Sequence, residues 1–198
     1  QGSESVEDGG PPVEPTPSAE TRPRANKAAA AERRQLTVAS CELSLGAHGG
    51  MDPEDLREIV RSYYGCVADT ARRYDAFVAN THGNTASLFF GYPQAREDDA
   101  ERAVHAALSL VAAVVSLKSL IPLHARIGIA TGLVVVGDPA SVGGAPDVAG
   151  ETPNIAARLH SIAAPDMVVV AESTQRLLGA LFELRDLGVQ NLEGIAEG

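Results

Sequence analysis

Phe77–Phe90 is the stretch FVANTHGNTASLFF, in which two β-branched and apolar runs enclose a short polar turn. The runs Phe77–Thr81 and Ala86–Phe90 have the composition of strands. The four residues between them, His82–Thr85, include a glycine and an asparagine, which favour tight turns because both tolerate unusual backbone angles. The stretch therefore predicts a β-hairpin near the middle of the chain.

Helical patterns flank this hairpin on both sides. Asp52 is typical of a helix N-cap, Pro53 suits the first helical position, and apolar residues then recur at helical spacing as far as Tyr74. After the hairpin, a second amphipathic helix is expected to begin near Glu97 and to continue to Val115. The hairpin thus lies between two helices that each have an apolar face to bury.

Strands are expected outside the two helices, at Gln35–Leu43 and at Ala125–Ala130, where β-branched and apolar residues cluster. The resulting order β-α-β-β-α-β is that of a ferredoxin-like core, so we expect an α/β fold of the α+β type. C-terminal additions to this core are predicted at Leu133–Val136, Thr152–Ile162 (helix), Met167–Val170 (strand), Thr174–Leu178 (helix), Phe182–Leu184 and Val189–Leu192 (strands).

The first 31 residues differ in composition from the rest of the chain. They contain five of the 12 prolines and very few large apolar side chains, so they cannot bury enough surface to offset the entropy of ordering. We interpret residues 1–31 as a disordered tail or linker and Gln1-Gly2-Ser3 as the scar of a cleaved purification tag. The expected organisation is one domain over residues 32–198, cut from a longer protein.

Charge and cysteine content narrow the functional classes. The 198 residues have a formal net charge of −10. Proteins that bind nucleic acid or an anionic membrane surface do so through clustered Lys and Arg, which an acidic chain does not favour. We therefore expect no nucleic-acid partner and no membrane partner. Cys41 and Cys66 lie in apolar stretches, so we expect both thiols to be free and buried. Free thiols are typical of the reducing cytosol. Because no apolar run reaches the ~20 residues of a membrane span, we expect a cytoplasmic protein.

Several further stretches form a recognisable series along the chain. They are AERRQLTV (Ala31–Val38), FGYP (Phe90–Pro93), EDDAERA (Glu97–Ala103), RIGIATG (Arg126–Gly132), GETPNIAARL (Gly150–Leu159) and LEGIAE (Leu192–Glu197). In this order they resemble the class III adenylyl/guanylyl cyclase homology domain. The resemblance is greatest to bacterial members that precede an ATPase and helical-repeat region.

The resemblance implies a metal-dependent reaction and also shows that the metal positions are altered. In the family, two carboxylates hold two divalent ions that assist attack of the ribose 3′ oxygen on the α-phosphate. Glu42 occupies the place of the first metal aspartate and has one more methylene, and Asn84 occupies the place of the second and is neutral. We therefore expect weak metal binding or none, with Asn84 serving as a turn residue. No cofactor is expected unless cyclase activity remains, in which case it is Mn²⁺ or Mg²⁺.

The purine and transition-state positions are partly retained. Asn80 occupies the place of the purine-reading lysine, and Asp147 matches the base-reading aspartate but is equally interpretable as an ordinary loop carboxylate. Asn154 and Arg158 match the pair that stabilises the transition state from the second subunit, and their spacing places them on one helix face.

Three functions remain open from the sequence. The first is a catalytically inactive regulatory, dimerisation or nucleotide-sensing module in cyclic-nucleotide signalling. The second is a weak or Mn²⁺-dependent cyclase that makes cAMP or cGMP from ATP or GTP. In the third, the chain is the half of a heterodimer that does not hold the metal. The expected partners are a second copy, another cyclase domain, or effector domains attached in the full-length protein.

Overall fold

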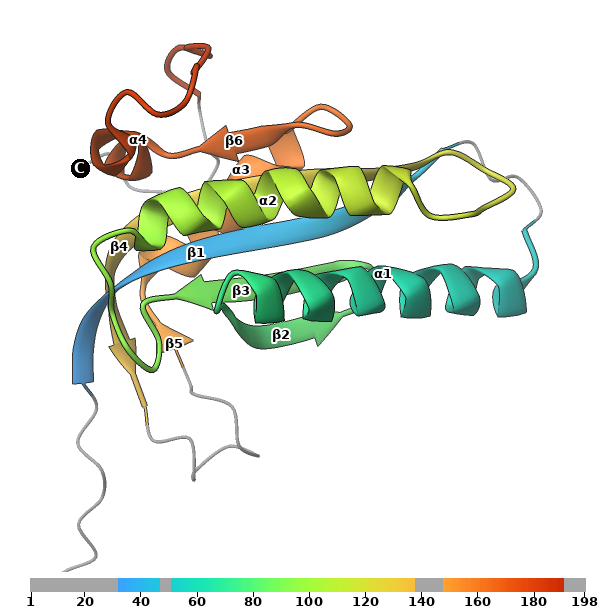
Figure 1. The fold of residues 1–198 in the computed structure, drawn as a ribbon, viewed down its shortest axis with the longest axis horizontal. Helices are drawn as coiled ribbons and strands as arrows, with labels where there is room; N and C mark the ends of the chain where they lie inside the picture. The colour runs from blue at the N-terminus through green and yellow to red at the C-terminus, as the bar shows by residue number, and fades with distance from the viewer. Residues whose placement is uncertain (1–31, 47–50, 138–147, 191–198) are drawn as a thin grey trace, which may run out of the picture.

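Two long antiparallel strands form the middle of the sheet in this computed structural model, which describes residues 32–46, 51–137 and 148–190. β1 (Glu32–Leu45) and β4 (Leu123–Val136) pair along their whole length, from Glu32 opposite Val136 to Leu45 opposite Leu123. Figure 1 shows them running side by side through the molecule. Because both strands are fourteen residues long, they position everything else that lies on the sheet.

The predicted hairpin extends the sheet on one side of β1. β2 (Phe77–His82) and β3 (Thr85–Phe90) are joined by the two-residue turn Gly83-Asn84, which is shorter than the four-residue turn expected. Gly83 has a φ of +60°, a backbone angle that glycine adopts without strain. The strand order is β2-β3-β1-β4-β5, where β5 is Val148–Ala149, and β6 (Val168–Val170) pairs in parallel with β4.

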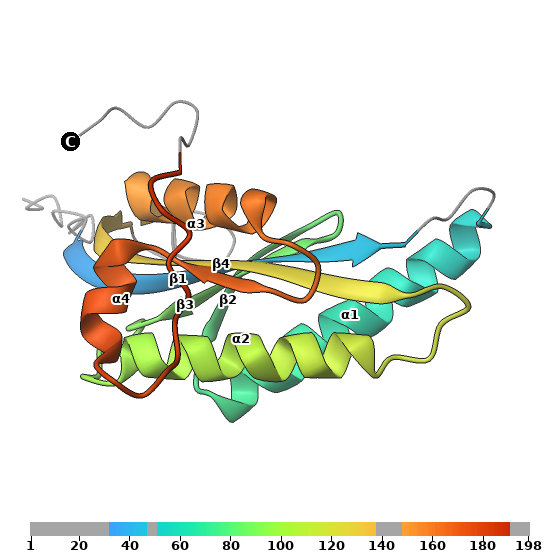
Figure 2. The same cartoon turned by 90° about the horizontal axis from the view of Figure 1, so that it is seen from above.

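Helices cover both faces of this sheet. α1 (Pro53–Arg73) and α2 (Asp99–Val115) lie on one face and α3 (Glu151–Ile162) lies on the other, as Figure 2 shows from above, while the short α4 (Glu172–Leu178) lies near one end of α2. The Asp52 side chain accepts a hydrogen bond of 2.9 Å from the Glu54 amide, which confirms the predicted N-cap of α1. The predicted ferredoxin-like order and α+β class are confirmed.

β1 contributes side chains to a buried apolar cluster on each face of the sheet. Ala39, Cys41 and Leu43 are buried among residues of α1 and α2, whereas Leu36 and Val38 are buried with Ala156 of α3. This arrangement is expected of a strand covered on both faces, because successive side chains point to opposite sides. Cys41 is free and buried as predicted, and Cys66 is free but only partly buried.

Contact between α3 and β4 is unusually close at two glycines. A Cβ atom on Gly128 would lie 2.2 Å from the carbonyl oxygen of Ala156 and 2.4 Å from the amide of His160. A Cβ on Gly132 would lie 2.5 Å from the Thr152 hydroxyl. The RIGIATG stretch therefore provides the surface on which the backbone of α3 rests.

Two predictions about strands were wrong. β4 continues without a break through Gly132, so the apolar run at Leu133–Val136 is part of β4 and not an addition to it. Phe182–Leu184 and the described part of Val189–Leu192 form no strand, and most of these side chains are exposed. Both short runs have apolar residues, but a strand also needs a neighbouring sheet edge to pair with. Residues 1–31, Asp147 and residues 191–198 lie outside the described part of the chain.

Candidate active site

Glu42 lies near the end of β1, between the hairpin and β4. It is opposite Thr85 on β3 and opposite Arg126 on β4, and both Glu42 and Arg126 are half-buried. Antiparallel pairing with both neighbours fixes the Glu42 backbone on either side. The position expected for the first metal ligand is therefore rigid and has an arginine as its immediate neighbour.

Asn84 lies at the tip of the hairpin and is bonded to β1. Its side-chain Nδ2 donates a hydrogen bond of 2.8 Å to the carbonyl oxygen of Leu43, and the Leu43 amide donates one of 2.8 Å to the carbonyl oxygen of Asn84. On the other side of the tip, the Tyr64 hydroxyl of α1 donates to the carbonyl oxygen of Gly83 at 2.8 Å. The structure thus places Glu42 and Asn84 on the lining of one hollow, with the Asn84 Nδ2 already bonded to Leu43.

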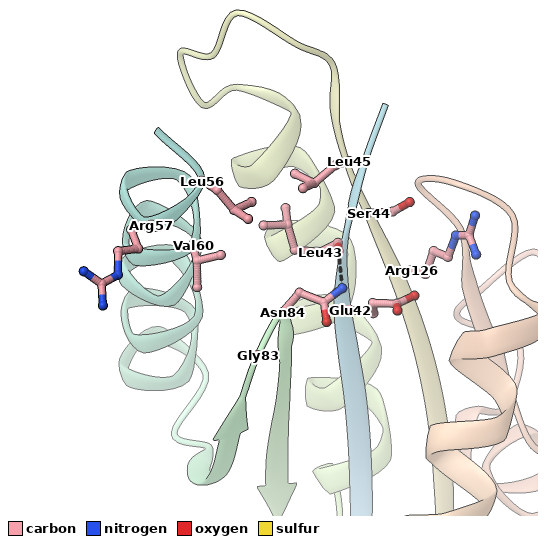
Figure 3. A pocket seen from close by; sticks show the side chains of 10 residues that line it. All are labelled: Glu42, Leu43, Ser44, Leu45, Leu56, Arg57, Val60, Gly83, Asn84 and Arg126. Atoms are coloured by element: carbon pink, nitrogen blue, oxygen red, sulfur yellow. Dashed lines mark hydrogen bonds between the residues drawn. The ribbon is translucent and has the colours of Figure 1, made fainter. Parts of the chain in front are cut away.

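A hollow of about 610 Å³ opens around these two residues, and Figure 3 shows its lining. Glu42 and Asn84 lie at its base, with Arg126 beyond Glu42 on one side of β1. Leu56 and Val60 of α1 form an apolar wall on the other side of β1. Glu42 and Arg126 therefore lie on one side of the hollow, and Arg57 of α1 is the charged lining residue on the other side.

Arg126 and His160 are neighbours of Glu42 that the sequence analysis did not identify. The Nε of Arg126 is buried and has no hydrogen-bond partner among the described residues. His160 Nδ1 is 2.9 Å from the Ser40 hydroxyl of β1. Burial lowers the pKa of His160, the Glu42 carboxylate opposes this shift, and the Arg126 guanidinium adds to it. His160 therefore lies within the electrostatic reach of both charged groups.

The sequence signal for these two residues was indirect. Arg126 belongs to the stretch RIGIATG, but its position opposite Glu42 depends on the register between two strands that are far apart in the chain. His160 follows Arg158 on α3, yet a single histidine on a helix does not indicate which strand it contacts. Only the packing of α3 on the sheet brings both residues to the candidate site.

Asn154 and Arg158 lie away from Glu42. Thr152, Ala156 and Leu159 are the buried residues of α3, whereas Asn154 is exposed and Arg158 is half-buried. At 100° per residue, Asn154 and Arg158 occupy the side of the helix opposite to Ala156. Within the described residues, Arg158 takes part in none of the ion pairs. One chain therefore does not bring the expected transition-state pair to its own metal positions.

The structure describes only one of the two residues expected to read the purine, Asn80, and not the other, Asp147. Asn80 is exposed on the edge strand β2, next to an irregularity in its pairing with β3 between Val78 and Asn80. Asp147 lies outside the described residues, so its predicted role stays a prediction. Asn80 is uncharged, so it does not supply the cationic donor of a lysine, although its amide can donate and accept hydrogen bonds.

The residues at the metal positions do not fit a pair of divalent ions. Glu42 supplies the one carboxylate, and Asn84 offers a neutral amide oxygen whose nitrogen is bonded to Leu43. In the described parts of the chain, no group of three or more His, Cys, Asp or Glu side chains is placed to hold a metal ion. A single Mg²⁺ ion is held by one or two carboxylates together with waters and substrate phosphates, so two ions need more than the carboxylate of Glu42. The donor set is too small and too weakly charged for that chemistry.

Comparison with known families gives a clear assignment. A family model described as the adenylate and guanylate cyclase catalytic domain matches residues 39–198. The chain therefore belongs to the family of adenylate and guanylate cyclase catalytic domains. A protein of Rhizobium meliloti (strain 1021), uncharacterized protein R02095, is 27% identical over 181 residues. The match covers 88% of this chain and 18% of that protein, so the chain spans less than a fifth of the relative's length.

Solved structures of cyclase domains have the same fold. The adenylyl cyclase CyaB from P. aeruginosa is similar with a TM-score of 0.73 and 22% identity, over 85% of this chain and 92% of that one. The guanylate cyclase domain of RhGC from Catenaria anguillulae, solved with GTP, has a TM-score of 0.75 and 20% identity, over 83% of this chain and 93% of that one. In the described residues of this chain, none of the helices has the length and apolarity needed to cross a bilayer.

Proposed function

We propose that this domain is a degenerate cyclase domain that acts as a regulatory, dimerisation or nucleotide-sensing module and does not form cyclic nucleotides. The main support is the hydrogen bond from the Asn84 amide to the Leu43 carbonyl oxygen, at a position where the family has a metal aspartate. That bond gives Asn84 a structural role, and its remaining Oδ1 is a neutral oxygen in place of a charged carboxylate. Glu42 alone provides too little negative charge for two divalent ions.

Nucleotide sensing without turnover is supported by Arg126. Its buried Nε has no hydrogen-bond partner among the described residues, and it borders the hollow at Glu42. A guanidinium forms strong, geometrically specific hydrogen bonds with phosphate oxygens. The much greater length of the R. meliloti relative is consistent with attached effector domains that such a module would regulate. We also propose that the module works in the cytoplasm, where nucleotides are available.

Turnover assays test the central claim. The wild-type chain is incubated with ATP or GTP and either Mn²⁺ or Mg²⁺, and formation of cAMP and cGMP is compared with a blank and with the Arg158→Ala variant. We expect no product above the blank in any of these reactions. Product from the wild-type chain that disappears in Arg158→Ala would show that the domain is a weak cyclase.

Binding is measured separately from turnover. Titration of ATP or GTP, with and without Mn²⁺, is followed through the backbone amide signals of Glu42, Asn84 and Asn154. Shifts at Glu42 and Asn84 without Mn²⁺, reduced in Arg126→Gln, would support nucleotide sensing. An absence of shifts at millimolar nucleotide would leave dimerisation or effector contact as the function of the domain.

A second candidate function is that of a complementing half-site. Its specific support is the outward-facing pair Asn154 and Arg158, on the opposite side of α3 from the sheet. The partner would be a cyclase domain with both metal aspartates whose own transition-state arginine has been replaced by alanine. Cyclic nucleotide formed only when the wild-type chain is added, and not when Arg158→Ala is added, would demonstrate complementation.

A further inference from the structure

The tip of the β2–β3 hairpin is fixed from two sides by hydrogen bonds. On the β1 side, Leu43 and Asn84 form a closed ring of two bonds, one between backbone groups and one from the Asn84 side-chain amide, each 2.8 Å long. On the α1 side, the Tyr64 hydroxyl donates to the Gly83 carbonyl oxygen at 2.8 Å. Figure 3 shows the dashed bond from Asn84 to Leu43 at the base of the hollow.

The chemistry of this ring requires a hydrogen-bond donor in the side chain at position 84. The Leu43 carbonyl oxygen is an acceptor, so its partner must be a donor, and the Nδ2 of asparagine is one. An ionised carboxylate has acceptors only. Two acceptor oxygens at hydrogen-bond distance repel each other, so an aspartate in this geometry would have to rotate away and leave the Leu43 carbonyl without this partner.

We infer that Asn84 is a metal-independent clamp: its side chain holds the hairpin against β1 without the divalent ions that position this tip in a metal-binding site. This inference rests on the proposed absence of a metal pair and adds what has replaced it. It follows that the geometry of the hollow around Glu42 and Arg126 is the same with and without divalent cations. It also follows that restoring an aspartate at position 84 destabilises the hairpin before any metal is bound.

The chain contains a matched control for this inference. Asn80 lies on the same hairpin and is exposed, as Asn84 is, but its side chain forms no hydrogen bond with any residue that the structure describes. Asn80→Asp and Asn84→Asp therefore make the same chemical change four residues apart. Only Asn84→Asp affects the clamp. The full 198-residue chain is used for both, in buffer containing EDTA.

Unfolding by urea measures the stability of each variant at pH 7. We expect Asn84→Asp to raise the equilibrium constant of unfolding about tenfold, because a hydrogen bond is lost and an acceptor is left facing another acceptor. We expect Asn80→Asp to change it less than about twofold, as for an exposed surface substitution. Equal effects of the two substitutions would overturn the inference.

The pH dependence gives a second, independent result. A protonated aspartic acid has one O–H donor and can restore the bond to Leu43, so folding raises the pKa of the introduced carboxyl above its unfolded value of about 3.9. The destabilisation is therefore complete at pH 7, decreases as the pH falls through the raised pKa, and is gone below the unfolded value of about 4. Asn80→Asp should show no such recovery relative to the wild-type chain. A stability deficit of Asn84→Asp that is unchanged at pH 3.5 would contradict the clamp.

Two further measurements cover the case in which Asn84→Asp does not fold. Asn84→Ala removes the donor without adding an acceptor, and hydrogen exchange of the Leu43 amide, which is bonded to the Asn84 carbonyl oxygen, should be faster in it than in Asn80→Ala. In the wild-type chain, the Leu43 exchange rate should be the same in EDTA and in millimolar Mn²⁺. Slowing of this exchange by Mn²⁺ would overturn the clamp. Product in the turnover assay would instead contradict the proposed function and leave the clamp result unchanged.

Discussion

The α3–β4 contact and the hairpin tip differ in how they hold the fold together. At the first, two glycines allow the backbone of α3 to approach the sheet, and Asn154 and Arg158 lie on the opposite side of the helix. At the second, side-chain hydrogen bonds from Tyr64 and Asn84 hold the hairpin tip in place. The helix is therefore held by close backbone packing, whereas the hairpin tip is held by a few polar side chains.

The α3–β4 contact can be broken at Gly128. We expect Gly128→Ala to reduce the free energy of unfolding by about 3 kcal/mol, because the new Cβ meets backbone atoms of Ala156 and His160 that cannot rotate away. Gly132→Ala is the matched control, because the nearest neighbour of its new Cβ is a threonine hydroxyl that can rotate. We expect this substitution to reduce the free energy of unfolding by only about 1 kcal/mol. Urea unfolding measures both, and a larger loss at Gly132 would mean that α3 rests mainly on its N-terminal end.

The hairpin tip is also expected to contribute less to stability than the contact of α1 with β1, and two adjacent tyrosines of α1 compare these two contacts. The Tyr63 hydroxyl is fully buried and donates to the Cys41 carbonyl oxygen at 3.0 Å, whereas the Tyr64 hydroxyl bonds to the exposed hairpin tip. We expect Tyr63→Phe to lower the free energy of unfolding by about 1.5 kcal/mol and Tyr64→Phe to lower it by about 0.5 kcal/mol. The two variants are compared by thermal unfolding, and the reverse order would make the hairpin tip the stronger of the two contacts.

Stability should depend on pH through His160, which lies between the two regions. Burial lowers its pKa below the ordinary value of 6.5, so the unfolded chain binds a proton more readily than the folded one. The stabilisation is therefore present above pH 6.5 and decreases as the pH falls through that value. Urea unfolding at pH 5.5 and 7.5 should show a smaller pH dependence in His160→Gln than in the wild-type chain. If the stability of His160→Gln and of the wild-type chain depended on pH in the same way, titratable groups other than His160 would cause that dependence.

The smallest expected effect concerns the thiols. Burial raises the pKa of Cys41 to about 12, and burial and nearby charge also raise the pKa of the partly exposed Cys66. Because the thiolate is the reactive form, native labelling at pH 8 should modify Cys66 slowly and Cys41 only after unfolding. Mass spectrometry of the labelled chain separates the two sites. Rapid native labelling of Cys41 would show that β1 opens much more often than its burial implies.

Local patterns in the sequence were sufficient for the core of the fold. The N-cap at Asp52, the helical spacing of apolar residues and the glycine in the hairpin turn are properties of neighbouring residues, and each predicted its element correctly. The predicted strand at Phe182–Leu184 failed because strand formation depends on a free sheet edge, which no local pattern reports. The number of residues in the hairpin turn was also misjudged, since His82 and Thr85 belong to the paired strands.

Residue types and short-range spacing were enough to predict the family and the βαββαβ order, and both are confirmed. The same patterns led to the interpretation of Glu42 and Asn84 as altered metal positions, which stays a prediction. Only the folded chain shows that Arg126 lies opposite Glu42, that His160 contacts Ser40, and that Asn84 bonds to Leu43. Each of these contacts joins residues at least forty positions apart, so it depends on strand register and helix packing. Local residue patterns therefore predicted the elements, whereas the contacts that hold the hairpin tip against β1 form only in the packed sheet.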